Sequence, residues 1–271
     1  MESARATKNV ILSDIAKKKE KFMSNLSLAL TFSLVLIALA LSYKEKLGLE
    51  KDMLIGSARA VVQLTVIGYL LKFVFNLDNI WFTTIILLIM VYNAGAVAAK
   101  RGAGIGQALI ISFAAILSGL VITLGGLLAF GAITYEPSQV IPISGMVVGN
   151  SMVATSLLFK TLLSNFQAKR EEIEVKLCLG AAPKEASINL IRDSIKTAML
   201  PTFDSMKTLG IVQLPGMMTG LILAGVAPET AIKYQIMVAF MLAGAVTISS
   251  FVASYWAYRN FFTTQLQLKD I

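Results

Sequence analysis

The sequence predicts an all-α protein, a polytopic transmembrane helical bundle of about seven spans. Composition is the first reason: 56% of the 271 residues are hydrophobic and only 15% are charged, whereas soluble domains carry about 25% charged residues. The mean hydropathy of +0.73 agrees. The second reason is the repetition of apolar runs long enough to cross a hydrocarbon core of about 30 Å. Because only short polar spacers separate the runs, we expect a single transmembrane domain over residues 26–271.

Seven apolar runs are candidate spans. The second is weakened by Arg59 and Gln63, and the sixth is interrupted by Pro215 and Gly216. We expect Arg59 to extend to the headgroups, since long basic side chains near a span's end can do so. In chain order the runs are 26–43, 54–75, 80–99, 105–134, 140–163, 198–226 and 231–258.

Basic side chains indicate which side of the membrane is cytoplasmic. The longest polar segment, residues 164–197, contains Lys169, Arg170, Lys176, Lys184, Arg192 and Lys196. Lys and Arg accumulate in cytoplasmic loops, so we expect this segment in the cytoplasm. Counting spans outward from it places further cations on the same side: Lys44, Lys46, Lys51, Lys100, Arg101, Arg259 and Lys269. The connections on the opposite side, 76–79, 135–139 and 227–230, contain the acidic residues Asp78, Glu136 and Glu229 and no Lys or Arg. The asymmetry predicts an external N-terminus, a cytoplasmic C-terminus and a multi-pass protein of the cell inner (plasma) membrane.

The basic leader, residues 1–25, disagrees with this topology. Its cations, Arg5, Lys8, Lys17, Lys18, Lys19 and Lys21, favour a cytoplasmic N-terminus. Either the first run does not span the membrane, or translation begins at Met23. We favour the second explanation, and N-terminal sequencing of protein made from the native gene tests it.

Several function classes are excluded by residues that the chain lacks. Cys178 is the single cysteine and histidine is absent, so an intrachain disulfide, a cysteine metal cluster and histidine acid–base catalysis have no residues to use. Residues 102–107 are glycine-rich without the lysine of a phosphate-binding loop. We therefore expect no catalytic residue and no cofactor in this chain. The net charge of +8 lies in the membrane-flanking segments, which indicates contact with a lipid bilayer and no nucleic acid.

The first informative motif is the charged segment 171–185. Glu171 and Glu174 flank an apolar stripe of Ile173, Leu177 and Leu179, and Gly180 is placed to cap a short amphipathic helix. The segment is either an ordinary cytoplasmic helix and turn or a helix that docks in a partner's groove.

Two further motifs lie within apolar runs. In 141–152, Gly145 and Gly149 permit close helix packing, and Met146, Asn150 and Met152 accompany them. In 210–220, Pro215 and Gly216 should kink or break the helix beside Met217 and Met218. Each motif is either a packing feature or the lining of a translocation pathway. Thioethers beside open backbone carbonyls could contact a soft cation.

One charged pair lies near the inner end of the sixth run. Asp204 and Lys207 are three residues apart on one helical face, so they either pair with each other or form a cytoplasmic gate.

Segment 171–185 resembles the EAA loop of bacterial ABC permeases, although Val175 and Lys176 replace two alanines of that pattern. With residues 57–64, 141–152, 210–220 and 231–237, the chain resembles the iron-export permeases called FetB or YbbM, a family that includes plant permeases linked to aluminium tolerance. The resemblance extends over nearly the whole chain from about residue 26.

The resemblance implies a permease subunit that works as a homodimer with a separate cytosolic ABC ATPase, on which ATP and magnesium are bound. Export of iron or another metal cation is implied; export of a small organic solute such as a nucleotide sugar is the alternative. Coupling to the ATPase is then expected of Glu171, Glu174, Leu177, Leu179 and Gly180. A pathway lining is expected of Gln63, Met146, Asn150, Met152, Pro215, Met217 and Met218, and no metal ligand is assigned.

Overall fold

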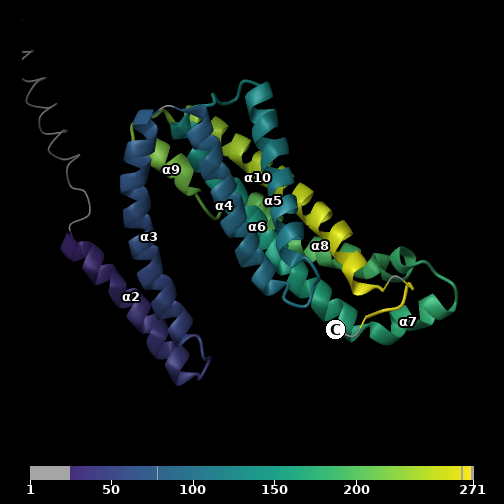
Figure 1. The fold of residues 1–271 in the computed structure, drawn as a ribbon. Helices are drawn as coiled ribbons and strands as arrows, with labels where there is room; N and C mark the ends of the chain where they lie inside the picture. The colour runs from purple at the N-terminus through teal and green to yellow at the C-terminus, as the bar shows by residue number, and fades with distance from the viewer. Residues whose placement is uncertain (1–24, 78, 264, 270–271) are drawn as a thin grey trace, which may run out of the picture. The chain divides into compact units, whose positions relative to one another are not determined.

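The computed structural model describes residues 25–77, 79–263 and 265–269, and all of the regular secondary structure in these ranges is helical (Figure 1). The chain divides into two units between Phe73 and Val74. The first contains α2 (Asn25–Lys44) and most of α3 (Glu50–Leu77). The second contains α4 (Ile80–Arg101), α5 (Ala108–Ala129), α6 (Pro137–Ala168), α7 (Arg170–Cys178), α8 (Pro183–Thr208), α9 (Gly216–Leu223), α10 (Pro228–Ala257) and the 3-10 helix η1 (Tyr258–Phe261).

The helical membrane fold predicted from composition is confirmed. Among the described residues, five helices are long and apolar enough to cross a membrane: Glu50–Leu71, Ile80–Arg101, Ala108–Ala129, Pro137–Ala168 and Pro228–Phe261. These correspond to the second, third, fourth, fifth and seventh apolar runs. The first run forms α2, whose apolar part, Leu30–Lys44, is shorter. The basic leader lies outside the described residues except for Asn25.

The sixth run forms two helices. α8 ends at Thr208 and α9 begins at Gly216, with Pro215 as its N-cap, so the predicted break at Pro215 and Gly216 is confirmed. α8 also starts earlier than the run, because Pro183 occupies its first turn and Glu185 accepts a hydrogen bond from the N–H of Ala182. A buried face of Ala186, Leu190, Ile191 and Ile195 recurs at helical spacing. The polar segment 164–197 is therefore the end of α6, α7 and the first half of α8.

Small residues bring the long helices of the second unit together. α5 packs against α10, α4 and α6, and α10 also packs against α6 and α8. At Gly119 of α5, an added Cβ would lie 3.0 Å from the carbonyl oxygen of Ala245 on α10 and 3.6 Å from Ser151 Oγ on α6. The backbones of α5 and α10 are thus in near contact, as small residues allow in membrane helices.

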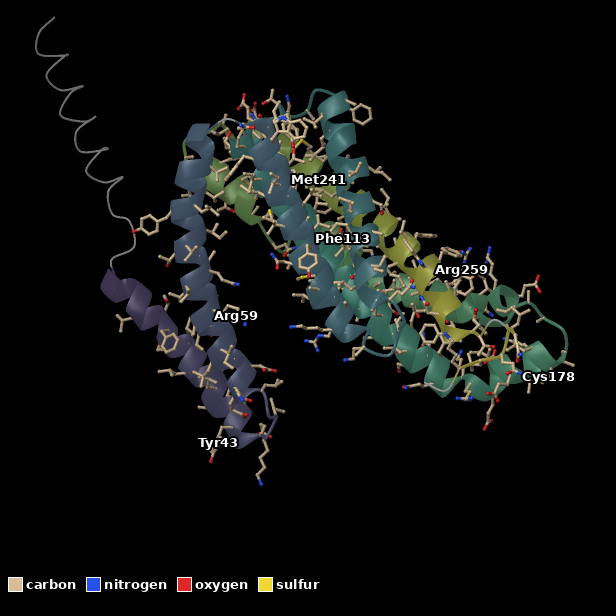
Figure 2. All side chains as sticks on the ribbon, in the orientation of Figure 1. Tyr43, Arg59, Phe113, Cys178, Met241 and Arg259 are labelled. Atoms are coloured by element: carbon tan, nitrogen blue, oxygen red, sulfur yellow. The ribbon has the colours of Figure 1, made fainter. Side chains whose placement is uncertain are left out.

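Aromatic side chains fasten the end of the second unit that carries α7. Phe166 of α6 stacks on Phe261 of η1 with ring centroids 4.1 Å apart, and the Lys184 ammonium lies 5.6 Å from the Tyr255 ring centre. Figure 2 shows Cys178 and Arg259 near this end and Met241 toward the other. A Cβ added at Gly106 would lie 3.3 Å from Asn260 Oδ1, so the connection 100–107 lies beside 258–269. The three basic connections of this unit, 100–107, 169–184 and 258–269, thus lie toward one end, as a shared cytoplasmic side requires.

Candidate functional site

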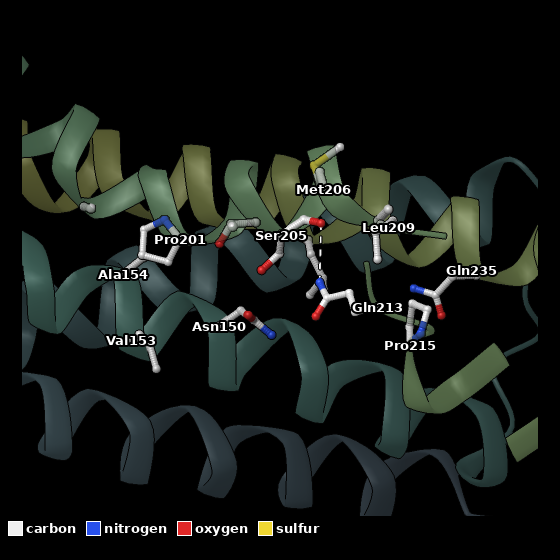
Figure 3. Close-up of a pocket in the computed structure, with 14 residues that line it drawn as sticks. Asn150, Val153, Ala154, Pro201, Ser205, Met206, Leu209, Gln213, Pro215 and Gln235 are labelled. Carbon is white, nitrogen blue, oxygen red and sulfur yellow. Dashed lines mark hydrogen bonds between the residues drawn. The ribbon is translucent and has the colours of Figure 1, made fainter. Parts of the chain in front are cut away.

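A partly open cavity lies in the second unit where the sixth run is broken, and most of its lining is apolar. It has a volume of about 290 Å³ and is lined from α6, α8, the turn 209–215 and α10. Its polar lining consists of Asn150, Thr202, Ser205, Gln213 and Gln235, and its apolar lining includes Ala154, Pro201 and Met206. Figure 3 shows Asn150 and Gln213 on facing sides of this space, with Gln235 beside Pro215. The lining thus combines neutral amides and hydroxyls with apolar groups.

The turn that forms one wall depends on Gly210. Its φ is +80°, a left-handed conformation that side chains with a Cβ rarely adopt. The Gly210 N–H donates to the carbonyl of Gln213 at 3.0 Å, and the N–H groups of Val212 and Gln213 donate to the carbonyl of Thr208 at 3.0 and 3.4 Å. These bonds close a compact turn after α8 and direct Gln213 to the cavity.

Hydrogen bonds orient two of the three cavity amides. Asn150 Nδ2 donates to the carbonyl of Met146 at 2.9 Å, and Gln213 Nε2 donates to the carbonyl of Ser205 at 3.4 Å. Both bonds use the nitrogen, so the amide oxygens are available as acceptors. The oxygen Oε1 of Gln235 is buried without a hydrogen-bond partner among the described residues, which is unusual for a buried polar atom. The cavity therefore offers acceptors to a ligand that brings donors.

A second cavity of about 560 Å³ adjoins the first. The two cavities share Met206, Leu209, Pro215, Gln235 and Ala239, so the broken segment and Gln235 separate two spaces along α10.

The structure divides the predicted pathway residues into three groups. Asn150 and Pro215 line the first cavity, and Pro215 and Met218 line the second. Met146, Met152 and Met217 are partly buried and pack against the apolar core cluster, as flexible thioether side chains commonly do. Gln63 lies on α3 in the other unit. The pathway roles of all seven residues stay predictions.

The two intramembrane charges near the cavity pair with each other. Lys207 Nζ lies 2.8 Å from Asp204 Oδ1, and both side chains are exposed. Among the described residues, no group of three or more His, Cys, Asp or Glu could hold a metal ion. An ion in the cavity would therefore contact uncharged oxygen atoms first.

The predicted coupling segment forms α7, which has the charge pattern of a stable short helix. Glu171 and Glu172 lie in its first turn and Lys176 in its last, which complements the helix dipole. Gly180 has a φ of +91°, and the N–H of Ala181 donates to the carbonyl of Lys176 at 3.0 Å. Gly180 is thus the C-terminal cap that the sequence predicted.

The apolar stripe predicted for this segment is divided. Ile173 is buried in the core and Leu177 packs against the same core, whereas Leu179 is 82% exposed and Val175 is 58% exposed. A stripe of residues 173, 177 and 179 is not a single face because residue 179 follows the helix end. The apolar surface offered to a partner is therefore that of Val175 and Leu179.

A groove of about 620 Å³ lies beside α7. One side is formed by Glu174, Leu177, Cys178 and Gly180, and the other by residues 265–268 near the C-terminus. The terminal segment folds back on η1, since the N–H of Lys269 donates to the carbonyl of Phe261 at 2.9 Å. Three of the predicted coupling residues, Glu174, Leu177 and Gly180, thus line the groove opposite the C-terminal segment.

Two ion pairs hold the charged face of α7. Arg170 Nε lies 2.7 Å from Glu174 Oε1, and Lys176 Nζ lies 2.6 Å from Glu172 Oε1. The hydrogen bond from Lys176, with that cation's charge, lowers the pKa of the Glu172 carboxyl below its ordinary value of 4.5. The Glu172 carboxyl is therefore charged at neutral pH.

Sequence reasoning missed Ser205, Gln213 and Gln235 as cavity residues. A signal was present for the two glutamines, because polar amides within apolar runs are expensive in a membrane and mark interior positions. The convergence of residues 150, 213 and 235 from separate elements has no signature in a single sequence.

Long apolar helices, with a helical run broken beside a cavity that contains a few amide side chains, define a multi-pass membrane protein. The chain belongs to the uncharacterised protein family UPF0014, whose family model matches residues 25–262. It is 48% identical over 246 residues to the probable iron export permease protein FetB of Escherichia coli (strain K12), which covers 91% of this chain and 95% of that protein.

Plant proteins are among the relatives. The identity is 39% over 238 residues to the UPF0014 membrane protein STAR2 of Oryza sativa subsp. japonica, covering 88% of this chain and 84% of that protein. It is 37% over 235 residues to the protein ALUMINUM SENSITIVE 3 of Arabidopsis thaliana, covering 87% and 86%. No solved structure matches the chain. The family resemblance and the multi-pass inner-membrane localisation expected from the sequence are confirmed.

Proposed function

We propose that the chain is the membrane-spanning permease subunit of an ABC transporter that exports iron or another metal cation, driven by a separate ATPase subunit. The observation that carries the proposal is the pairing of a cavity containing three amide side chains, at a broken helix, with a capped helix-turn at the basic end. A relative that is 48% identical is named a probable iron export permease, which supports the choice of cargo. In this proposal, ATP and magnesium bind to the partner, and two copies of the permease enclose the pathway.

The proposed topology has seven spans, an external N-terminus and a cytoplasmic C-terminus. It counts α8 with α9 as one interrupted span and α2 as another. The gathering of three basic connections at one end of the second unit supports a cytoplasmic α7. We expect the exposed Val175 and Leu179, with Glu171 and Glu174 beside them, to dock in a groove of the ATPase.

The chemistry of the cavity favours a cation over a nucleotide sugar. A nucleotide sugar carries two phosphates, and proteins bind phosphates mainly through Arg, Lys or helix N-termini. Among the described residues that line the cavity, none is Lys or Arg. Amide oxygens, by contrast, are ligands or hydrogen-bond acceptors for hard cations and their water.

The decisive experiment is ATPase stimulation. The permease is reconstituted in lipid nanodiscs with its ATPase, and hydrolysis is measured with ferrous iron, cuprous ion and UDP-glucose. We expect ferrous iron to stimulate hydrolysis, and the effect to be lost in Gln235→Leu. Stimulation by UDP-glucose with no response to any metal would replace metal export by organic-solute export.

A further inference from the structure

The cavity is large enough for an ion that keeps its water. Its volume of about 290 Å³ is room for roughly nine water molecules at about 30 Å³ each. A six-coordinate aqua ion, with six waters around one small cation, therefore fits. A bare cation of ordinary radius would contact only one side of such a space.

The polar groups of the cavity are acceptors without charge. The orientation of Asn150 and Gln213 is set by hydrogen bonds through their nitrogens to the carbonyls of Met146 and Ser205, at 2.9 and 3.4 Å. Their oxygens, and the buried Oε1 of Gln235, can accept hydrogen bonds. The described lining of the cavity contains no carboxylate, thiolate or imidazole that could replace the water of a divalent ion.

The chemistry of aqua ions matches these groups. Proteins often bind Mg²⁺ with several of its waters retained, since this ion releases its water reluctantly. Water bound to a cation is a strong hydrogen-bond donor, because the metal draws charge from its oxygen. Amide oxygens on several sides of a water-sized space suit such donors, and their neutrality keeps the ion weakly held, as transport requires.

We propose that the cavity recognises a divalent cation with its first hydration shell intact, through Asn150 Oδ1, Gln213 Oε1 and Gln235 Oε1. This inference rests on the proposed metal export, and it specifies the form in which the ion occupies the permease. The coordinated waters donate to the three amide oxygens, and Gln235, which lines both cavities, contacts the shell on either side of the broken segment.

Hexaamminecobalt(III) tests this mode of binding directly. Its six ammonia ligands do not exchange, so it imitates an aqua ion and cannot be coordinated by protein atoms. The complex of full-length permease and ATPase is loaded with Mn²⁺, and free Mn²⁺ is followed by electron paramagnetic resonance. We expect hexaamminecobalt(III) to displace Mn²⁺ from the cavity. Bound Mn²⁺ that resists displacement, or no binding of Mn²⁺, would overturn the proposal.

Substitutions assign the binding to the three amides. Asn150→Leu, Gln213→Leu and Gln235→Leu should each weaken both ligands about tenfold, the value of one hydrogen bond. Gln167→Leu is the matched control, since Gln167 is an exposed amide near the end of α6. Gln235→Glu keeps the shape and adds a charge, so it should tighten both ligands. Equal affinities in wild type and all three leucine variants would refute the assignment, as would an unchanged Gln235→Glu.

The failure of this inference differs from the failure of the export proposal. If ferrous iron stimulates ATP hydrolysis but hexaamminecobalt(III) does not displace Mn²⁺, export stands and the retained shell is wrong. If only UDP-glucose stimulates hydrolysis, the export proposal itself is wrong.

Discussion

Single residues decide where this chain can change direction. Gly180 and Gly210 both have φ values in the left-handed region, +91° and +80°. The first ends α7 and the second starts the turn that holds Gln213. A Cβ added at either glycine would have no described atom within 4 Å, so the backbone conformation alone explains the requirement for glycine.

Because only backbone conformation requires glycine at position 180, a substitution there tests coupling without disturbing the packing of other side chains. Gly180→Val should cost about 1–2 kcal/mol at the cap, because a β-branched residue is strained at positive φ, and should release the ATPase while the bundle stays folded. Gly180→Asn is the matched control, since Asn tolerates this conformation. Copurification of the two subunits and thermal unfolding of the permease measure both effects. A normal subunit ratio with Gly180→Val would argue against this docking site.

The sequence predicted this cap correctly because a glycine after an amphipathic helix, with Pro183 beyond it, has a local signature. It did not predict which side chains the cap would expose. Whether Leu177 faces a partner or the chain's own core depends on Phe166, Ile191 and Phe261, which are distant in sequence and lie in the same cluster.

The helix α5 lies close to α10 at Gly119. Gly119→Ala should destabilise the bundle by about 1–3 kcal/mol, since its Cβ would meet the Ala245 carbonyl oxygen at 3.0 Å. Gly125→Ala lies on the same helix, where an added Cβ would have no described atom within 4 Å, so it should be neutral or slightly stabilising. Melting temperatures in one detergent compare the two. Equal melting temperatures would show that α5 and α10 can separate without cost.

The charge on α7 makes this helix sensitive to acid. The pKa of Glu172 is lowered by Lys176, so the stabilisation is present above the ordinary pKa of the carboxyl and is lost as pH falls through the lowered value. We expect amide protection in α7 to decrease in that range. Hydrogen exchange measured against Lys176→Gln at each pH cancels the intrinsic pH dependence. A constant ratio of protection between the two proteins would contradict the effect.

At the scale of elements, the sequence predicted where a helix breaks but not how long each helix is. Pro215 and Gly216 predicted the break in the sixth run, because proline lacks the N–H that a helix needs. A polar helix after Gly180 was expected, but its start at Pro183 and its continuation into the sixth run were not, because its outer face is charged whereas the run is apolar. Its buried face at Leu190 and Ile191 becomes visible when residues are read at helical spacing.

At the scale of the whole molecule, the alternation of basic and acidic connections along the chain gives the second unit one basic end and one acidic end. The connections that contain Lys100, Lys184 and Arg259 share an end. Glu136 immediately precedes the first turn of α6, and Glu229 lies in the first turn of α10. Composition and charge order were enough to predict this arrangement. The cavity was not predictable in the same way, because it exists only where α6, α8 and α10 converge.

The single cysteine provides a direct test of both orientation and docking. Cys178 is exposed and lines the groove beside α7, so a membrane-impermeant maleimide should label it in inside-out vesicles and not in intact spheroplasts. The bound ATPase should slow the reaction, because Val175 and Leu179 beside Cys178 would be covered. Glu136→Cys in a Cys178→Ser background is the matched control, and it should label from the outside only. Labelling of Cys178 in intact spheroplasts would reverse the proposed topology, and an unchanged rate with the ATPase bound would move the docking surface away from α7.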